Sequence, residues 1–318
     1  MFDRGKFYER LRSRSGYEKF YQSSDTKLVY KYDSLWFEVV VKIYHSPTIL
    51  YNKFQNKLYI PNLSVIMIDS YFLVNRKLTF CPYVQACYPD TQTCMQMVDI
   101  LVQAGAKILE LGIPFSDPAA DWPVLTQINH ESVAKGITII ESLEFISQVK
   151  KKYPDLGICI MTYFNPVYQY GVDKFVEYLA THHIDSYLIP DLPVWEIWNM
   201  PDHPDVTRTM LVSDNLDDKT ILDVVAHTSW YLYVLSSVTI TWGDLQFQSV
   251  LWKFIERLRL LIWTEKKLVV WFWIKSSEHI NFLRTIDLDG FIIWSEIVKQ
   301  FQQWGLPNLK EYISNLKI

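Results

Sequence analysis

Two carboxylates eleven residues apart, Glu110 and Asp121, could together carry out acid–base chemistry in this sequence. Glu110 lies in the apolar run KILELGIPF at 107–115. Burial in such a run raises the pKa of a carboxyl group, which would keep a proton available for general acid catalysis. A glutamate paired with a buried Lys or Arg would fit the same pattern, so the spacing alone leaves both interpretations open.

Asp121 lies in the proline-punctuated segment PFSDPAADWP at 114–123. This segment is too long for a tight turn between a strand and a helix, and its prolines restrict its shape. Such a loop is typical of a lid or a binding element. Asp117 and Asp121 could equally be turn-forming residues whose side chains accept hydrogen bonds from their own backbone.

The elements that must position these residues follow a regular alternation. From about Thr79 onward, short apolar runs rich in β-branched residues alternate with longer stretches of helical period, which is typical of βαβ units in a parallel sheet. The predicted strands lie at 79–86, 107–111, 158–164, 185–190, 207–213, 231–236, 268–273 and 289–294. The predicted helices include 91–104, 139–152, 171–183, 217–227, 246–262 and 276–286.

Eight strands with intervening helices predict an α/β protein whose strands close into a (β/α)8 TIM barrel. In such a barrel the reactive side chains lie where strands end and loops begin, which favours Glu110 as a functional residue. An open, doubly wound sheet is the alternative architecture. That fold usually has a glycine-rich turn after its first strand, and VQACYPD at 84–90 lacks this pattern.

The composition fits one large barrel domain at 66–318, preceded by an N-terminal extension at 1–65. The chain has 318 residues, of which 49% are hydrophobic, which is enough to bury one large core. The extension is aromatic and lysine-rich and has no clear period. Because so short a segment has a poor surface-to-volume ratio, we expect an added surface or capping segment, or sequence upstream of the true start, rather than an independent domain.

Charge and cysteine content argue against several classes of function. The formal net charge of −4 and the pI near 6.0 give no basic excess for binding nucleic acid or an anionic membrane. No run reaches the ~18 apolar residues of a membrane span, and the N-terminus lacks the apolar core of a signal peptide. The four cysteines lack the CxxC spacing of a zinc site and are too few for a disulfide scaffold. These features predict reduced, partly buried thiols, no metal site and a cytoplasmic location.

The segment LELGIPFSDPAADWP at 109–123 resembles the signature of the tryptophan synthase α-subunit family. Further blocks resemble the family in the correct order between about 65 and 316, and several ordered blocks are more specific than any one motif. These blocks are FCPYVQACYPD (80–90), MTYFNPVYQYG (161–171), YLIPDLPVWE (187–196), YLYVLSSVTITWG (231–243), VVWFWIKSSEH (269–279) and DGFIIWSEIVK (289–299).

The resemblance implies a lyase that cleaves indole-3-glycerol phosphate by a retro-aldol reaction, giving indole and glyceraldehyde 3-phosphate. Carried over by motif, Glu110 is the catalytic acid and base, and Asp121 stabilises the indolenine-like intermediate. Tyr233 is implied to assist catalysis, although tyrosines on strands are also common in cores. Thr241 is implied to steady the Asp121 loop. The implied substrate-binding residues are Tyr83, Leu125, Tyr163 and Phe272 around the indole ring, with Thr241, Trp242, Trp273, Trp294 and Ser295 toward the phosphate.

The same resemblance implies a β subunit as partner, in an α2β2 assembly whose pyridoxal phosphate belongs to the β subunit. The α subunit itself would need no cofactor. The partner face would include Asp117, Pro118, Asn165 and Pro193. A catalytically impaired α-like subunit that only binds and activates its β partner is the alternative, and another phosphate-binding barrel enzyme of amino-acid biosynthesis is a third interpretation.

Six tryptophans stand at positions where the family has glycine, namely Trp122, Trp230, Trp242, Trp271, Trp273 and Trp294. Tryptophan does not allow the close backbone approach that glycine gives a phosphate, and it would fill the site with an indole of its own. One hypothesis is that these positions are glycine in the cell, because UGA is read as glycine in some bacterial lineages. Cys87, Ser186 and Thr239 also replace family glycines, and recoding of UGA does not explain them.

Overall fold

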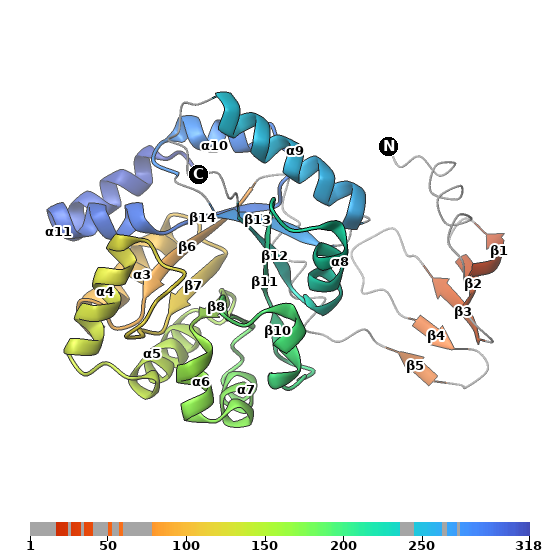
Figure 1. The fold of residues 1–318 in the computed structure, drawn as a ribbon, viewed down its shortest axis with the longest axis horizontal. Coiled ribbons are helices and arrows are strands. Elements are labelled where there is room, and N and C mark those ends of the chain that lie inside the picture. Colours follow the sequence, from red (N-terminus) through yellow and green to blue (C-terminus); the bar gives the residue numbers. More distant parts are fainter. Residues whose placement is uncertain are drawn as a thin grey trace. The chain divides into compact units, whose positions relative to one another are not determined.

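The computed structural model describes residues 17–24, 27–32, 35–40, 50–52, 57–59, 78–235, 245–262, 266–271 and 274–318. The chain divides into two compact units, Met1–Ile66 and Met67–Ile318. The first unit holds a five-stranded antiparallel sheet whose strands follow chain order (Figure 1). Its strands are β1 (Tyr17–Ser24), β2 (Lys27–Tyr32), β3 (Leu35–Val40), β4 (Leu50–Asn52) and β5 (Lys57–Tyr59). The sequence pattern predicts none of them, because this segment lacks a clear period.

The second unit is built on a parallel sheet that matches the eight predicted strands. Its order is β10-β9-β8-β7-β6-β14-β13-β12-β11, so the first strand of this unit, β6, pairs with the last, β14. The strands are β6 (Thr79–Gln85), β7 (Ile108–Gly112), β8 (Gly157–Met161), β9 (Ser186–Leu188), β10 (Thr207–Arg208), β11 (Met210–Ser213), β12 (Tyr231–Leu235), β13 (Lys267–Trp271) and β14 (Gly290–Ile293).

The barrel closes at Thr209, which separates β10 from β11. The backbone N–H of Thr209 donates a hydrogen bond to the carbonyl of Tyr187 at 2.9 Å. On one side of this residue β10 pairs with β9, and on the other side β11 pairs with β12. The two short strands are therefore the two halves of the single predicted strand at 207–213, and the sheet is a TIM barrel rather than an open doubly wound sheet.

Helices surround the barrel and connect successive strands (Figure 1). Six of them, α3, α5, α7, α8, α9 and α10, fall on the ranges predicted from sequence, whereas α4, α6, η1 and α11 are additional. The helices are α3 (Thr91–Gln103), α4 (Pro123–Ala134), α5 (Ile139–Lys152), α6 (Phe164–Tyr170), α7 (Val172–Thr181), the 3-10 helix η1 (Val194–Asn199), α8 (Asp218–His227), α9 (Leu245–Ile262), α10 (Ser277–Leu283) and α11 (Ser295–Asn315).

Local capping explains where several of these helices begin. The side chain of Asp90 accepts a hydrogen bond from the backbone N–H of Thr93 at the start of α3. Thr138 and Glu141 form a reciprocal capping box at the start of α5. Helix α11 is kinked at Gly305, whose φ of 74° lies in the left-handed region that favours glycine, so two helical segments meet there. None of the described helices is long and apolar enough to cross a membrane.

The buried side chains form two layers that follow the alternation of the strands. Along β7, Leu109 and Leu111 pack in the outer layer between strands and helices, whereas Ile108 packs in the inner layer. Glu110 follows Ile108 by two residues, so its side chain also faces the inside of the barrel. The inner layer further contains Cys81, Tyr83, Cys159, Tyr163, Tyr231, Tyr233 and Trp294. All four cysteines are free and buried.

Candidate active site

Glu110 lies in the middle of β7, in register with Tyr83 on β6 and Cys159 on β8. Its side chain is fully buried, and this burial raises the pKa of the carboxyl group to about 8. A hydrogen bond from Trp294 opposes the rise, and the charge of Asp121 adds to it. Within the described ranges no Lys or Arg forms an ion pair with Glu110, so the ion-paired alternative does not hold in this structure.

The two carboxyl oxygens of Glu110 have different surroundings. Oε2 accepts a hydrogen bond from Nε1 of Trp294 at 3.1 Å. Oε1 is buried and has no hydrogen-bond partner among the described residues. Because leaving a buried polar atom unpaired is costly, this oxygen is a natural place for a ligand group to bind and to exchange a proton.

Asp121 lies in the loop that leads from β7 to α4, so it reaches the barrel mouth from the same strand as Glu110. Nδ2 of Asn129 donates a hydrogen bond to Oδ2 of Asp121 at 2.9 Å. Burial raises the pKa of Asp121 to about 7, and the neighbouring Tyr163 hydroxyl and Asn129 amide oppose the rise. An open hollow of about 520 Å³ reaches Asp121 from the surface of α4, so this carboxyl group is more accessible than Glu110.

The two carboxyl groups influence the same tyrosines. Burial raises the pKa of Tyr83 and of Tyr233, and the charges of both Glu110 and Asp121 raise it further. Tyr233 is fully buried on β12, and its hydroxyl has no hydrogen-bond partner in the part of the chain that the structure describes. The structure therefore brings the three predicted catalytic residues together at one end of the barrel.

An indole ring already lies beside Glu110, because Trp294 points into the barrel from the end of β14. Its ring centroid lies 4.6 Å from that of Tyr83, 5.2 Å from that of Trp271 and 6.2 Å from that of Tyr233. The residue is only 6% exposed. The resemblance assigned Trp294 to the phosphate end of the site, but in this structure its side chain fills the aromatic pocket next to the carboxyl group.

The other predicted substrate-binding residues are partly within reach of this pocket. Leu125 on α4 and Tyr163 after β8 are buried in the same inner layer, and the Tyr163 hydroxyl accepts a hydrogen bond from the backbone N–H of Ala120 at 3.1 Å. Ser295 is the first residue of α11, and its side chain is half-buried. Four further predictions, Thr241, Trp242, Phe272 and Trp273, lie outside the described residues.

The predicted partner-facing residues lie on three neighbouring loops. Asp117 and Pro118 follow β7, Asn165 is the second residue of α6 after β8, and Pro193 precedes η1 after β9. Asp117 and Asn165 are exposed, Pro193 is half-buried, and Pro118 is buried. Since β7, β8 and β9 are adjacent in the barrel, these loops share one side of its mouth.

Residues 72–316 match the family model described as tryptophan synthase alpha chain. The chain belongs to this family. The tryptophan synthase alpha chain of Syntrophotalea carbinolica is 26% identical over 249 residues, which are 77% of this chain and 96% of the relative. That of Staphylococcus aureus is 29% identical over 244 residues, which are 75% of this chain and 96% of the relative.

Solved structures agree with the barrel fold of a tryptophan synthase alpha chain. A tryptophan synthase complex from Pyrococcus furiosus matches 75% of this chain and 97% of its own chain, with a TM-score of 0.67 and 24% identity. The tryptophan synthase alpha chain of Legionella pneumophila matches 80% of this chain and 96% of its own, with a TM-score of 0.69 and 24% identity. At this identity the similarity supports the fold.

The sequence pattern did not indicate two residues of this candidate site. Asn129, which holds Asp121, lies on α4, and that helix is absent from the predicted set because Pro123 and the prolines before it indicate a loop. Pro123 in fact occupies the first turn of α4, a position that tolerates proline because the N–H there has no helical partner. Gly112 was the second: a side chain at this position would meet the hydroxyl of Tyr83.

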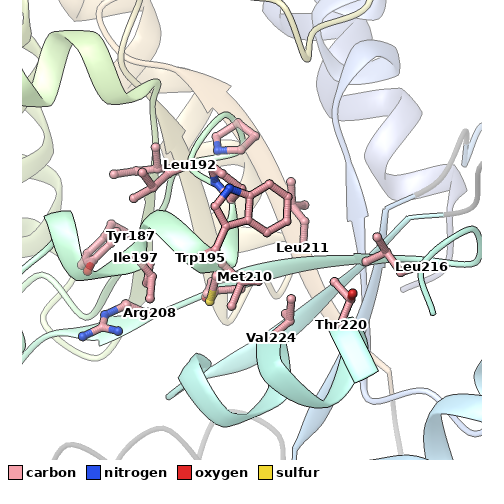
Figure 2. Close-up of a pocket in the computed structure, with 15 residues that line it drawn as sticks. Tyr187, Leu192, Trp195, Ile197, Arg208, Met210, Leu211, Leu216, Thr220 and Val224 are labelled. Atoms are coloured by element: carbon pink, nitrogen blue, oxygen red, sulfur yellow. The ribbon is translucent and has the colours of Figure 1, made fainter. Parts of the chain in front are cut away.

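A separate cavity of about 170 Å³ lies between η1, the β10–β11 strand and α8 (Figure 2). Its lining is mainly apolar and includes Leu192, Trp195, Met210 and Val224. Neither Glu110 nor Asp121 contributes to it. The candidate site at Glu110 and Asp121 and this cavity are therefore distinct.

Proposed function

We propose that this chain is a carbon–carbon lyase that cleaves indole-3-glycerol phosphate to indole and glyceraldehyde 3-phosphate in tryptophan biosynthesis, and that it acts in the cytoplasm. The observation that carries the proposal is a pair of carboxyl groups, Glu110 and Asp121, at one mouth of a barrel and beside an aromatic pocket. Their pKa values of about 8 and about 7 suit a proton donor and a neighbouring carboxylate near neutral pH. Membership in the tryptophan synthase alpha chain family supports the same reaction.

The reaction requires one proton to arrive and another to leave. In the proposed mechanism, protonated Glu110 donates to C3 of the indole ring, and ionised Asp121 stabilises the positive charge that develops at the ring nitrogen. Glu110, now a carboxylate, removes the proton of the hydroxyl group on the carbon attached to C3. The bond between this carbon and C3 then breaks, its electrons return to the ring as indole, and the carbon becomes the aldehyde. Tyr233, whose buried hydroxyl has no hydrogen-bond partner among the described residues, is placed to assist.

The position of Trp294 supports the proposed place of the substrate ring. Its N–H donates to Glu110 and its ring packs on Tyr83, which shows that an indole fits between the aromatic side chains and this carboxyl group. The substrate ring would bind in this same pocket. If residue 294 is tryptophan in the cell, its side chain must move aside for the substrate. Glycine at position 294 would instead leave the pocket open.

We propose further that the chain works with a β subunit that carries pyridoxal phosphate, in an α2β2 complex, and that the α subunit itself needs no cofactor. The name of one solved neighbour, the tryptophan synthase a2b2 complex from Pyrococcus furiosus, supports this partnership. The proposed contact face contains Asp117, Pro118, Asn165 and Pro193. The exposed positions of Asp117 and Asn165 agree with such a role.

The test is the release of indole from indole-3-glycerol phosphate by the full chain, alone and with a β subunit. We expect Glu110→Gln and Asp121→Asn each to lower kcat by at least about 100-fold, the usual contribution of a general acid or base, while Glu144→Gln, an exposed position on α5, leaves it unchanged. A wild-type chain that releases no indole but still activates the β subunit would overturn the proposed lyase and indicate an impaired, activating subunit.

A further inference from the structure

One buried amide holds both ends of the loop that carries Asp121. Asn129 lies on α4 and is only 2% exposed. Its Oδ1 accepts a hydrogen bond from the backbone N–H of Phe115 at 2.9 Å, near the start of the loop. Its Nδ2 donates to Oδ2 of Asp121 at 2.9 Å, near the end of the loop, and to the carbonyl of Leu125 at 3.0 Å.

The partners of Asn129 fix the orientation of its amide. The N–H of Phe115 can only donate and the carbonyl of Leu125 can only accept, so Oδ1 must face the first and Nδ2 the second. The oxygen of Asp121 therefore faces the NH2 group of Asn129, which stabilises the ionised form of Asp121. A carboxylate at position 129 could keep the bond to Phe115 but would repel Asp121, and an apolar side chain would lose all three bonds.

Other contacts between the loop and its surroundings show that the loop is held along its length. Nε2 of His130 lies 2.9 Å from the carbonyl of Ser116, and the hydroxyl of Tyr163 accepts from the N–H of Ala120. These contacts fix the backbone that leads to Asp121. The side chain of Asp121 itself accepts the hydrogen bond of Asn129, and the Tyr163 hydroxyl also favours its ionised form.

We propose that Asn129 is a positioning residue of the lyase site, which fixes the carboxylate of Asp121 toward the ring nitrogen of the substrate and favours its ionised form. This proposal rests on the proposed lyase function. The titratable groups around Asp121 include Glu110 on β7, Tyr83 on β6, Tyr163 after β8 and Tyr233 on β12, and His130 and Glu131 on α4 line the same hollow. None of these groups is a Lys or an Arg, so hydrogen bonding is the main means by which this site can stabilise a negative charge on Asp121.

The kinetic test uses the full chain and compares Asn129→Ala and Asn129→Asp with Gln127→Ala. Gln127 is an exposed residue on the same helix, and its amide donates a hydrogen bond to the side chain of Glu131. We expect both Asn129 variants to lower kcat by about tenfold or more, the usual weight of one hydrogen bond to a charged group, with a smaller change in KM. The acidic limb of the pH profile of kcat should move to higher pH, because loss of a hydrogen-bond donor makes Asp121 harder to ionise. Gln127→Ala should leave kcat and its pH profile unchanged.

A second measurement keeps the test independent of catalysis and of lost stability. The pKa of Asp121 can be followed by carbon NMR of protein labelled at aspartate carboxyl carbons, with Asp121→Asn to assign the signal. We expect this pKa to be higher in Asn129→Asp, which preserves the volume of the side chain, than in the wild type. An unchanged pKa would overturn the proposal. A raised pKa in a chain that releases no indole would support the role of Asn129 and count against the lyase function alone.

Discussion

At the level of single residues, the contact between Trp294 and Glu110 links the chemistry of the site to its packing. The indole N–H holds one carboxyl oxygen, while burial keeps the group protonated near neutral pH. Asp121 has a lower pKa than Glu110 and is more accessible. Over a narrow pH range between the two pKa values, Glu110 is therefore protonated while Asp121 is ionised. The two carboxyl groups therefore divide the roles of acid and charge stabiliser through their environments.

The pH dependence of indole release follows from these two pKa values. Activity requires protonated Glu110 and ionised Asp121, so kcat should fall below about pH 7, where Asp121 gains a proton, and above about pH 8, where Glu110 loses one. We expect a narrow bell-shaped profile, measured with the full chain at saturating substrate. A profile that stays flat across these values would contradict the assigned protonation states.

Replacing Trp294 tests whether its side chain occupies the place of a ligand. Trp294→Ala should cost about 3–5 kcal/mol of stability through the cavity it creates, and it should raise the affinity for indole by at least tenfold, because the ligand no longer competes with the side chain. The affinity can be measured by calorimetric titration with indole. Trp304→Ala is the matched control, since this tryptophan lies on α11, the helix that begins directly after Trp294, and is 71% exposed. Equal indole affinity in Trp294→Ala and wild type would show that the pocket is elsewhere.

At the level of elements, β7 positions the site through both a carboxyl group and a glycine. A Cβ atom on Gly112 would lie 1.9 Å from the hydroxyl oxygen of Tyr83, so the strand must lack a side chain where the Tyr83 ring crosses it. The Tyr83 hydroxyl also donates to Oε1 of Gln85 at 2.5 Å, which limits how far this ring can move. The position of Tyr83 in the pocket therefore depends on glycine two residues after Glu110.

Gly112→Ala should consequently displace Tyr83 and destabilise the protein by about 1–3 kcal/mol, the usual cost of overpacking a core. The additional change Tyr83→Phe removes the colliding oxygen and should restore part of the lost stability. Urea unfolding of the two single variants and the double variant measures this coupling. If the effects of the two changes are simply additive, the collision is not the cause.

The same elements show how far the sequence predicts this site. The eight strands and six helices follow from hydrophobic periodicity, which also places Glu110 and Tyr233 on barrel strands. Helix α4 could not be predicted because Pro123 reads equally as a loop residue, and with it Asn129 was missed. The break at Thr209 depends on pairing between distant strands, and the contact of Trp294 with Glu110 joins residues 184 positions apart. Local patterns carry no information about either.

For the molecule as a whole, the identity of residues at the family glycine positions decides how open the site is. Trp122, Trp271 and Trp294 form a connected row, with ring centroids 6.3 Å and 5.2 Å apart. Trp230 is buried beside Tyr231. Three large rings at the barrel mouth would become open space if these positions were glycine.

Peptide mass spectrometry of the natively expressed protein tests this directly. If UGA is read as glycine in the cell, peptides that cover positions 122, 230, 242, 271, 273 and 294 should carry the mass of glycine, and the coding sequence should have UGA at each of them. Peptides covering Trp252 and Trp304, which are not family glycine positions, provide an internal comparison. Tryptophan mass at 122, 242 and 273 refutes recoding.

The closure of the barrel at Thr209 also affects how copies of this chain can aggregate. A closed ring of strands leaves no free backbone edge onto which a strand of another molecule could add. In the part of the first unit that the structure describes, the five-stranded sheet ends at two edge strands, β1 and β5. Intermolecular strand addition should therefore begin in the N-terminal unit, and the barrel itself should resist it.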